Sequence, residues 1–391
     1  MRIGVNASFA RKPNTGIGQL TINFLKTLVK MQDSIYGLEF VLYLEEDLPE
    51  NMSLPENFRK RVFLPPYERD DLIRKIWWER YLLPKKVERD KCDVLISLYQ
   101  SATPIEEPLW HIMIVHDIIP KLFPEYLNNF RKKIYWKLTE NAIRGADKII
   151  AVSKRTEKDI IQNLGLDGEK IAVSYEDADE IYKKEIAIEK EAEILKKYKL
   201  KPGYIYNGGG LEARKNTEGV IRAYKFLLEK NKVEHFVRDF PRLIISGKLL
   251  PQLAPLATDA EKLVKELNLT EHVKLLDFVP QEDLPALYKN ASIFVFPSFY
   301  EGFGIPVLEA MNIGTPVITS KFSSLPEVGG DSVLYCDPDD IKDMAMVIKN
   351  VLLNKDLRET LMRRGKERAK NFDWKKFVGK IINLIRNESA S

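Results

Sequence analysis

The chain has 391 residues, of which 45% are hydrophobic and 30% are charged. That length exceeds the size at which one hydrophobic core keeps growing, so we expect two domains of roughly 200 residues each. The formal net charge of +4 is a weak basic excess that favours anionic ligands in general, and we expect no nucleic-acid partner.

The two cysteines and the hydropathy of the chain argue against a disulfide-rich, secreted or membrane-spanning protein. Cys92 and Cys336 lie in strand-like surroundings, where we expect small core residues instead of a disulfide or a metal site. Residues 1–5 enter a short apolar run without a signal-peptide pattern, and no stretch approaches the roughly 18 apolar residues that span a bilayer. We expect a cytoplasmic protein that meets a membrane, if at all, at its inner face.

Short apolar runs alternate with segments of helical periodicity in the first half of the chain. Amphipathic helices are predicted at residues 18–30 and 125–144. The predicted strands are residues 3–5, 40–43, 93–98, 112–115 and 148–152. This alternation is typical of a parallel sheet covered by helices on both faces.

The same alternation begins again in the second half. The predicted strands there are residues 204–206, 243–246, 273–276, 293–296 and 316–319, and the helices that follow are residues 341–353, 355–370 and 374–385, the last with Asp373 as its cap. Residues 174–200 are rich in Glu and Lys, contain no good strand and are placed as the interdomain connection. We therefore expect one domain at residues 1–180, a second at 181–372, and a C-terminal helix, 373–391, that packs back on the first.

The most informative segment follows the strand at residues 293–296 and leads into a helix. Pro306 suits a first helical turn, and Gly302 and Gly304 let backbone N–H groups approach a diphosphate closely. Glu301 precedes the helix and Glu309 lies about one turn inside it, so both carboxylates can line one ligand. The alternative is a strand–helix turn in which Glu301 is a cap and Glu309 is solvated.

This segment resembles the large family of retaining GT-B glycosyltransferases, glycosyltransferase family 4, which is marked by two glutamates separated by seven residues. The likeness continues through residues 310–311, 314–317 and 325–328. The resemblance implies an α/β GT-B fold, in which two Rossmann-like, doubly wound parallel-sheet domains face a cleft. It also implies that Glu309 holds the donor ribose, that Glu301 contacts the transferred sugar, and that the donor sugar and phosphates bind the backbone of Gly302, Phe303, Gly304 and Ile305.

A second segment, residues 206–216, brings Arg214 and Lys215 to the start of another helix. Cations and helix N-termini offset the negative charge of a departing diphosphate without a metal, although a solvated basic pair is the simple alternative. By resemblance, Lys215 is the stronger diphosphate ligand and Arg214 the weaker. Many relatives carry a further arginine near this turn, and whether Arg214, Lys248 or nothing replaces it here stays open.

The same turn also fits a dinucleotide-binding fingerprint, with Gly208, Gly210 and Ala213 in the required spacing. A dehydrogenase is therefore an alternative. That site needs an acidic residue at the end of the next strand, whereas residues 243–246 lead into Gly247 and Lys248. The fingerprint alone is a weak signal.

Two features of the first half have counterparts in the family. Gly16 and Gly18 form a loop after the first strand, and the resemblance implies that this loop approaches the donor diphosphate and the acceptor. His116 ends the strand at residues 112–115, where open α/β sheets bind ligands, and the resemblance implies that it positions the sugar. A simple turn and a structural histidine are the alternatives.

Two further patterns carry charge. Residues 337–340 have an Asp-x-Asp spacing, which we attribute to helix capping and not to a metal site. Residues 59–91 contain 11 Lys/Arg and 6 Asp/Glu with interleaved aromatics, and residues 131–137 are similar. Docking to a membrane surface and ordinary helix packing with solvated charges both fit these two segments.

The resemblance implies a retaining hexosyltransferase that uses a nucleoside diphosphate sugar. It favours GDP-mannose, while uridine-linked glucose, galactose or N-acetylhexosamine stay open as donors. We expect that the enzyme needs no metal or other cofactor. The expected acceptor is a glycan or a lipid-linked glycan in polysaccharide biosynthesis. The expected catalytic residues are Glu301, His116 and Lys215. A sugar-nucleotide epimerase or phosphorylase of the same fold, and a non-catalytic nucleotide-sugar-binding protein, are the alternatives.

Overall fold

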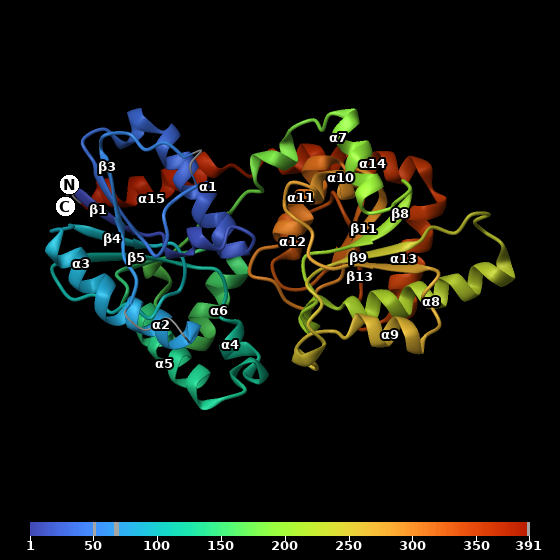
Figure 1. Cartoon of the computed structure of the whole chain (residues 1–391), viewed down its shortest axis with the longest axis horizontal. Coiled ribbons are helices and arrows are strands. Elements are labelled where there is room, and N and C mark those ends of the chain that lie inside the picture. The colour runs from blue at the N-terminus through green and yellow to red at the C-terminus, as the bar shows by residue number, and fades with distance from the viewer. Residues whose placement is uncertain (50–51, 66–69, 389–391) are drawn as a thin grey trace. The chain divides into compact units, whose positions relative to one another are not determined.

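The computed structural model describes residues 1–49, 52–65 and 70–388 and divides the chain into two compact units (Figure 1). Unit 1 contains Met1–Glu176 together with the C-terminal segment from Asp373, and unit 2 contains Asp177–Phe372. Each unit has its own parallel sheet. No helix in the described ranges combines the length and the apolar composition needed to cross a bilayer.

Unit 1 is built on a seven-stranded sheet with the order β3-β2-β1-β4-β5-β6-β7. All of its strand pairs are parallel. The strands are β1 (Arg2–Asn6), β2 (Glu39–Leu44), β3 (Phe58–Val62), β4 (Val94–Ser97), β5 (Trp110–Val115), β6 (Lys148–Ala151) and β7 (Ile171–Val173). The helices are α1 (Gly16–Lys30), α2 (Asp71–Trp77), α3 (Leu83–Arg89), α4 (Ile119–Leu122), α5 (Phe130–Gly145), α6 (Lys154–Leu164) and α15 (Trp374–Glu388).

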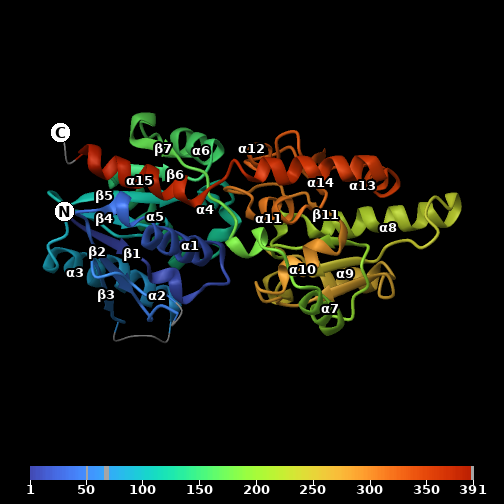
Figure 2. The ribbon, with the colours of Figure 1, turned by 90° about the horizontal axis from the view of Figure 1, so that it is seen from above.

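Helix α15 returns to unit 1 and packs against α1 (Figure 2). Asp373 accepts a hydrogen bond from the Lys375 amide at 2.7 Å, as a cap of this helix would. Arg386, near its other end, donates to the Ser34 carbonyl at 3.0 Å. The last helix is therefore part of the first core, although it follows the whole of unit 2 in the chain.

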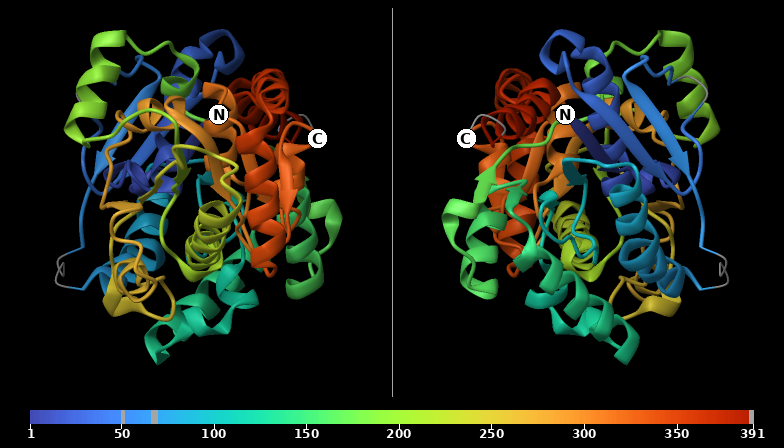
Figure 3. Two further views of the ribbon diagram at one scale, coloured as in Figure 1. Left: turned by 90° about the vertical axis from the view of Figure 1, so that its right-hand side faces the viewer. Right: turned by 90° about the vertical axis from the view of Figure 1, so that its left-hand side faces the viewer.

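Unit 2 is built on a six-stranded parallel sheet with the order β10-β9-β8-β11-β12-β13. The strands are β8 (Tyr204–Asn207), β9 (Leu243–Ser246), β10 (Val273–Leu276), β11 (Ala291–Phe296), β12 (Val317–Ser320) and β13 (Leu334–Cys336). The helices are α7 (Ile188–Lys197), α8 (Thr217–Glu234), α9 (Ala260–Glu266), α10 (Leu284–Lys289), α11 (Ile305–Ile313), α12 (Leu325–Gly329), α13 (Ile341–Leu353) and α14 (Lys355–Ala369). Helices α8, α9 and α13 form one buried core with the sheet, and the left view of Figure 3 shows α8, in yellow-green, facing the viewer. Helices α10, α12 and α14 contact α11.

The structure confirms two doubly wound parallel sheets and corrects the element list. Strands β3, β7 and β13 are absent from the predicted set, because β3 is a basic edge strand exposed after its first residue and the other two are three-residue edge strands. Helix α5 begins at Phe130 and not at Glu125. Pro124 starts a separate 3-10 turn, and the Asn129 side chain caps α5 by accepting from the Lys132 amide at 2.9 Å.

Candidate functional site

The loop between β11 and α11 forms the centre of the candidate site in unit 2. Helix α11 begins at Ile305, with Gly304 at its N-cap and Pro306 in its first turn, as predicted. Phe303 is 4% exposed, and its ring packs 5.7 Å from that of Phe372, so this residue can offer a ligand only its backbone. Because α11 begins at Ile305, the positive end of its helix dipole lies only a few residues after Glu301 in the chain.

Glu301 is a buried, ion-paired carboxylate and not a helix cap. It is 8% exposed, and its Oε2 lies 2.8 Å from Nη1 of Arg214. The Ser298 hydroxyl donates to Oε1 at 3.0 Å. Burial disfavours the charged form, but the Arg214 and Lys215 cations outweigh it and hold the pKa of Glu301 below its ordinary value. The carboxylate is therefore ionised at neutral pH.

Two serines after β12 hold the backbone of the same loop. Ser323 accepts from the Glu301 amide at 3.1 Å and donates to the Glu301 carbonyl at 2.5 Å. The Ser324 hydroxyl is placed between two carbonyls, that of Glu301 at 2.9 Å and that of Phe303 at 2.5 Å. The position of the Glu301 backbone is thus fixed independently of its side chain.

Arg214 and Lys215 lie on the short 3-10 turn Ala213–Lys215, and their surroundings differ. Arg214 donates to the Tyr300 carbonyl at 2.8 Å and pairs with Glu212 as well as Glu301. Lys215 donates to the Gly209 carbonyl and lies 3.9 Å from Glu301, a looser ion pair. Arg214 is thus saturated by protein groups, and Lys215 is the cation with more capacity for an anionic ligand.

The glycine turn after β8 brings Lys215 to this loop. A Cβ on Gly209 would lie 3.1 Å from both the Phe296 and the Pro306 side chains, so the turn packs directly against the first turn of α11. Lys248 follows Gly247, where a Cβ would lie 3.1 Å from the Cα of Gly210. The Lys248 side chain is exposed, so its charge lies at the rim of the turn.

Glu309 is buried in α11 and differs electrostatically from Glu301. It is 5% exposed, which excludes the solvated alternative, and its Oε2 accepts from the Tyr288 hydroxyl at 2.9 Å. Burial raises the pKa of Glu309 to about 7, although the Tyr288 and Tyr182 hydroxyls oppose the rise. A carboxyl group with that pKa exchanges between neutral and charged forms near neutral pH and responds readily to a hydroxyl-bearing ligand.

His116 is fully engaged by neighbours within unit 1. Its Nδ1 lies 3.0 Å from Glu176 Oε1, and its Nε2 lies 3.1 Å from the Leu98 carbonyl. Burial disfavours the imidazolium, but the Glu176 carboxylate outweighs it and raises the pKa of His116 above its ordinary value. With acceptors at both ring nitrogens, this imidazole is a poor general base and a well-oriented positioning group.

The two glycines of the first loop have different steric roles. A Cβ on Gly18 would lie 1.9 Å from the Lys12 carbonyl oxygen, so only glycine fits there. The Gly18 amide donates to the Thr15 hydroxyl at 3.1 Å and so completes the cap of α1. A Cβ on Gly16 would meet nothing within 4 Å. Of the two, Gly16 is the one that leaves open space beside the backbone.

The Asp-x-Asp segment caps a helix, as predicted. Asp340 accepts from the Lys342 and Asp343 amides at 2.8 and 3.1 Å, and Asp337 accepts from the Asp339 amide at 3.0 Å. Among the described residues, no group of three or more His, Cys, Asp or Glu side chains has the arrangement to hold a metal ion.

The basic, aromatic segment at residues 59–91 divides between core and surface, with residues 66–69 outside the described part of the chain. Trp78 is buried and stacks on Phe63 at 5.2 Å, as ordinary packing requires. Trp77 and Tyr81 are 41% and 56% exposed. Core packing thus accounts for Trp78 and Phe63, but it does not account for the exposed Trp77 and Tyr81.

The sequence did not indicate four residues that contact the predicted site residues. Ser323 and Ser324 contact Glu301, Tyr288 contacts Glu309, and Glu176 contacts His116. The two serines follow a predicted strand, where serine hydroxyls often hydrogen-bond to the backbone of a turn, so their position in the sequence could have indicated this role. Tyr288 and Glu176 lie far in the chain from the residues they contact, and no local pattern marks them. Tertiary packing alone brings them to Glu309 and His116.

Comparisons with known proteins show which family the chain resembles. Residues 16–176 match the family profile described as Glycosyltransferase Family 4, and residues 188–368 match Glycosyl transferases group 1. O-antigen chain mannosyltransferase B from Escherichia coli is 34% identical over 272 residues, which cover 69% of this chain and 68% of that protein. The serotype-specific mannosyltransferase WbdA of Escherichia coli is 29% identical over 71% of this chain, but the match spans only 33% of WbdA.

A solved structure supports the fold. HepE from Anabaena, in complex with UDP-glucose, superposes with a TM-score of 0.68 at 18% identity, covering 100% of this chain and 98% of HepE. Together with the two parallel sheets, this likeness confirms the expected GT-B fold.

The raised pKa of Glu309 predicts a pH-dependent stability. Between the ordinary value of 4.5 and about 7, the unfolded chain loses this proton before the folded protein does. The free energy of unfolding should therefore fall as pH rises through that window, by an amount on the order of 3 kcal/mol. Glu309→Gln, which stays neutral, should lack this component in urea unfolding measured from pH 4.5 to 8. Parallel curves for the two proteins would contradict the assignment.

Proposed function

The chain belongs to glycosyltransferase family 4, and we propose that it transfers mannose from GDP-mannose to a glycan or lipid-linked glycan in polysaccharide synthesis. The mannosyltransferase relatives, one of them named for O-antigen chains, support the sugar and the class of acceptor. The UDP-glucose complex of HepE supports a nucleotide sugar as donor. The observation that carries the proposal is the cluster of Glu301, Arg214 and Lys215 beside the start of α11, with Glu309 buried in the same helix.

Each group of this cluster has a task in donor binding. Glu309 accepts hydrogen bonds from the ribose hydroxyls, and Glu301 accepts them from the sugar. Lys215 and the N-terminus of α11 stabilise the charge that develops on the diphosphate as the glycosidic bond breaks. Arg214 keeps Glu301 ionised and in place through the 2.8 Å pair, so we assign it a positioning role.

We propose that the reaction retains the anomeric configuration. The acceptor oxygen attacks the anomeric carbon from the face on which the carbon–phosphate oxygen bond breaks, and the acceptor proton passes to the departing phosphate. His116 holds the sugar and does not take the proton, because acceptors already occupy both of its ring nitrogens. Orientation and charge stabilisation supply the rate acceleration.

The alternatives differ in measurable ways. An epimerase would interconvert nucleotide sugars without an acceptor, and a phosphorylase would need inorganic phosphate. A binding protein would be stabilised by the nucleotide sugar without turnover. Transfer of radiolabelled mannose to a glycan distinguishes the proposed function from all three.

We further propose that unit 1 contacts the inner face of an anionic membrane. Asp70, the N-cap residue of α2, pairs with Arg131 of α5 at 2.6 Å. The exposed apolar residues of these helices are Ile73, Trp77, Phe130 and Ile134, and the adjacent exposed lysines are Lys133 and Lys137. Exposed apolar side chains beside lysine ammonium groups suit such an interface.

Flotation of the protein with phosphatidylglycerol vesicles should be lost in Trp77→Ser, because this change removes an exposed aromatic side chain from the proposed surface. Undiminished flotation of the variant would count against this surface.

Lys215→Ala should abolish most transfer without unfolding the protein. Loss of one preorganised cation at a developing charge lowers kcat by about 100-fold or more. The matched control is Lys262→Ala on α9, whose side chain is 69% exposed and should be dispensable. Initial rates with GDP-mannose, together with thermal unfolding of both variants, decide the point. Wild-type rates in Lys215→Ala would refute the assignment.

Transfer should not require a divalent cation, because Lys215 and the helix N-terminus supply the charge that a metal supplies elsewhere. Rates measured with excess EDTA should equal those measured with added Mg²⁺ or Mn²⁺. Activity that EDTA abolishes and Mg²⁺ or Mn²⁺ restores would show that a metal takes part.

A further inference from the structure

A second polar cluster lies in unit 1, at the carboxyl ends of the neighbouring strands β1 and β4. Asn6 is the last residue of β1, and Tyr99 follows β4 by two residues. Glu79 reaches them from a π-helical turn, Trp78–Leu82, that joins α2 to α3. Ligands of open α/β sheets bind at this edge, and π-helical turns are frequent at functional sites.

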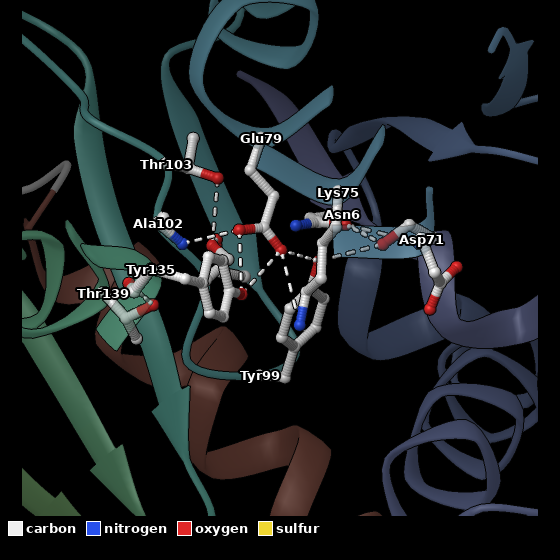
Figure 4. Close-up of polar contacts among 12 residues, drawn as sticks. Asn6, Asp71, Lys75, Glu79, Tyr99, Ala102, Thr103, Tyr135 and Thr139 are labelled. Carbon is white, nitrogen blue, oxygen red and sulfur yellow. Dashed lines mark hydrogen bonds and ion pairs between the residues drawn. The ribbon is translucent and has the colours of Figure 1, made fainter. Parts of the chain in front are cut away.

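The carboxylate of Glu79 is fully buried and saturated with hydrogen bonds (Figure 4). It accepts from the Tyr99 hydroxyl at 2.7 Å, the Ala102 amide at 2.8 Å and the Tyr135 hydroxyl at 3.0 Å. Tyr99 and Ala102 belong to the loop after β4, and Tyr135 belongs to α5. Glu79 therefore fixes the geometry of the cluster and has little capacity left for a ligand.

Lys75 is a cation whose hydrogen-bonding capacity is unused. Its Nζ lies 3.8 Å from Glu79 Oε1, too far for a hydrogen bond, and 4.8–5.0 Å from the ring centroids of Phe9, Tyr99 and Tyr135. Among the described residues, no group accepts a hydrogen bond from this Nζ. Burial lowers the pKa of Lys75, and Glu79 only partly offsets it. The Lys75 side chain as a whole is 22% exposed.

Asn6 supplies a second unused donor on the same network. Its Oδ1 accepts from the Ser8 hydroxyl at 2.9 Å, and Ser8 in turn contacts the Tyr99 hydroxyl at 3.1 Å. The Asn6 Nδ2 is buried and lacks a hydrogen-bond partner within the described chain. An unsatisfied buried donor costs about 1–3 kcal/mol, which a ligand oxygen would recover.

We propose that Lys75 and Asn6 bind hydroxyl oxygens of the acceptor glycan, with Glu79 as the positioning residue of this subsite. This inference rests on the proposed function, because it assigns the acceptor of that reaction to unit 1. The two unused groups of this cluster, the Lys75 ammonium and the Asn6 amide, are both donors, so its ligand must offer oxygen atoms that accept hydrogen bonds. A neutral sugar is favoured over a phosphate, because an anion would add charge beside the fully buried Glu79 carboxylate.

The test separates acceptor binding from donor binding. Lys75→Met keeps the aliphatic stem and removes the ammonium, and Asn6→Ala removes the amide. The matched control is Lys86→Met, since Lys86 also lies over an aromatic ring, that of Phe63 at 5.2 Å, but outside this cluster. The probe acceptor is a mannose disaccharide with an octyl aglycone, and the donor is GDP-mannose.

In both cluster variants, the KM for the disaccharide should rise about tenfold or more. The KM for GDP-mannose and the thermal stabilisation by GDP should match those of Lys86→Met. A merely structural defect would change donor binding as well as acceptor binding, so unchanged donor values separate the two explanations. An unchanged acceptor KM, or an equal rise in both KM values, would overturn the inference while leaving the proposed function intact.

If the wild-type protein transfers no sugar, the proposed function fails and a binding measurement decides the inference. Saturation-transfer NMR should then show contact with the disaccharide that Lys75→Met weakens and millimolar inorganic phosphate does not displace. Contact that survives both substitutions, or displacement by phosphate, would reject a sugar subsite at Lys75 and Asn6.

Discussion

The pair between Arg214 and Glu301 is the interaction on which the candidate donor site depends. It joins the turn after β8 to the loop after β11, and backbone contacts between the same loops reinforce it, including a 2.7 Å bond from the Phe299 amide to the Arg214 carbonyl. Because Glu301 is buried, removing the guanidinium would leave its carboxylate with only the looser Lys215 pair, and breaking a buried ion pair destabilises proteins by about 3–5 kcal/mol. Retaining such a pair keeps an ionised carboxylate beside the start of α11.

The two glutamates of one short segment are held in different states by their surroundings. Glu301 has cations beside it, which keep its pKa low, whereas Glu309 has tyrosine hydroxyls and apolar neighbours and a pKa of about 7. The same residue type thus offers a fixed negative charge at one point and an adaptable hydrogen-bonding group at another. Lys215, only loosely paired, completes a set suited to sugar, ribose and diphosphate.

The sequence was sufficient for the parts that depend on local patterns. Buried parallel strands, the proline-initiated helix and the Asp340 cap all follow from short-range chemistry and are present. Contacts between distant segments were not predictable, as with Tyr288 on Glu309 and Glu176 on His116. The pairing of Arg214 with Glu301 was not predictable for the same reason, because the two residues come from different loops. Edge strands such as β3 escaped because their residues are not buried.

Hydrogen exchange with and without GDP tests the central claim, that the donor binds between these two loops of unit 2. Saturating GDP should slow exchange of the amides at residues 208–216 and 298–309, while those of α9 (Ala260–Glu266) stay unchanged. Slowed exchange elsewhere in the chain, with neither loop affected, would contradict the account.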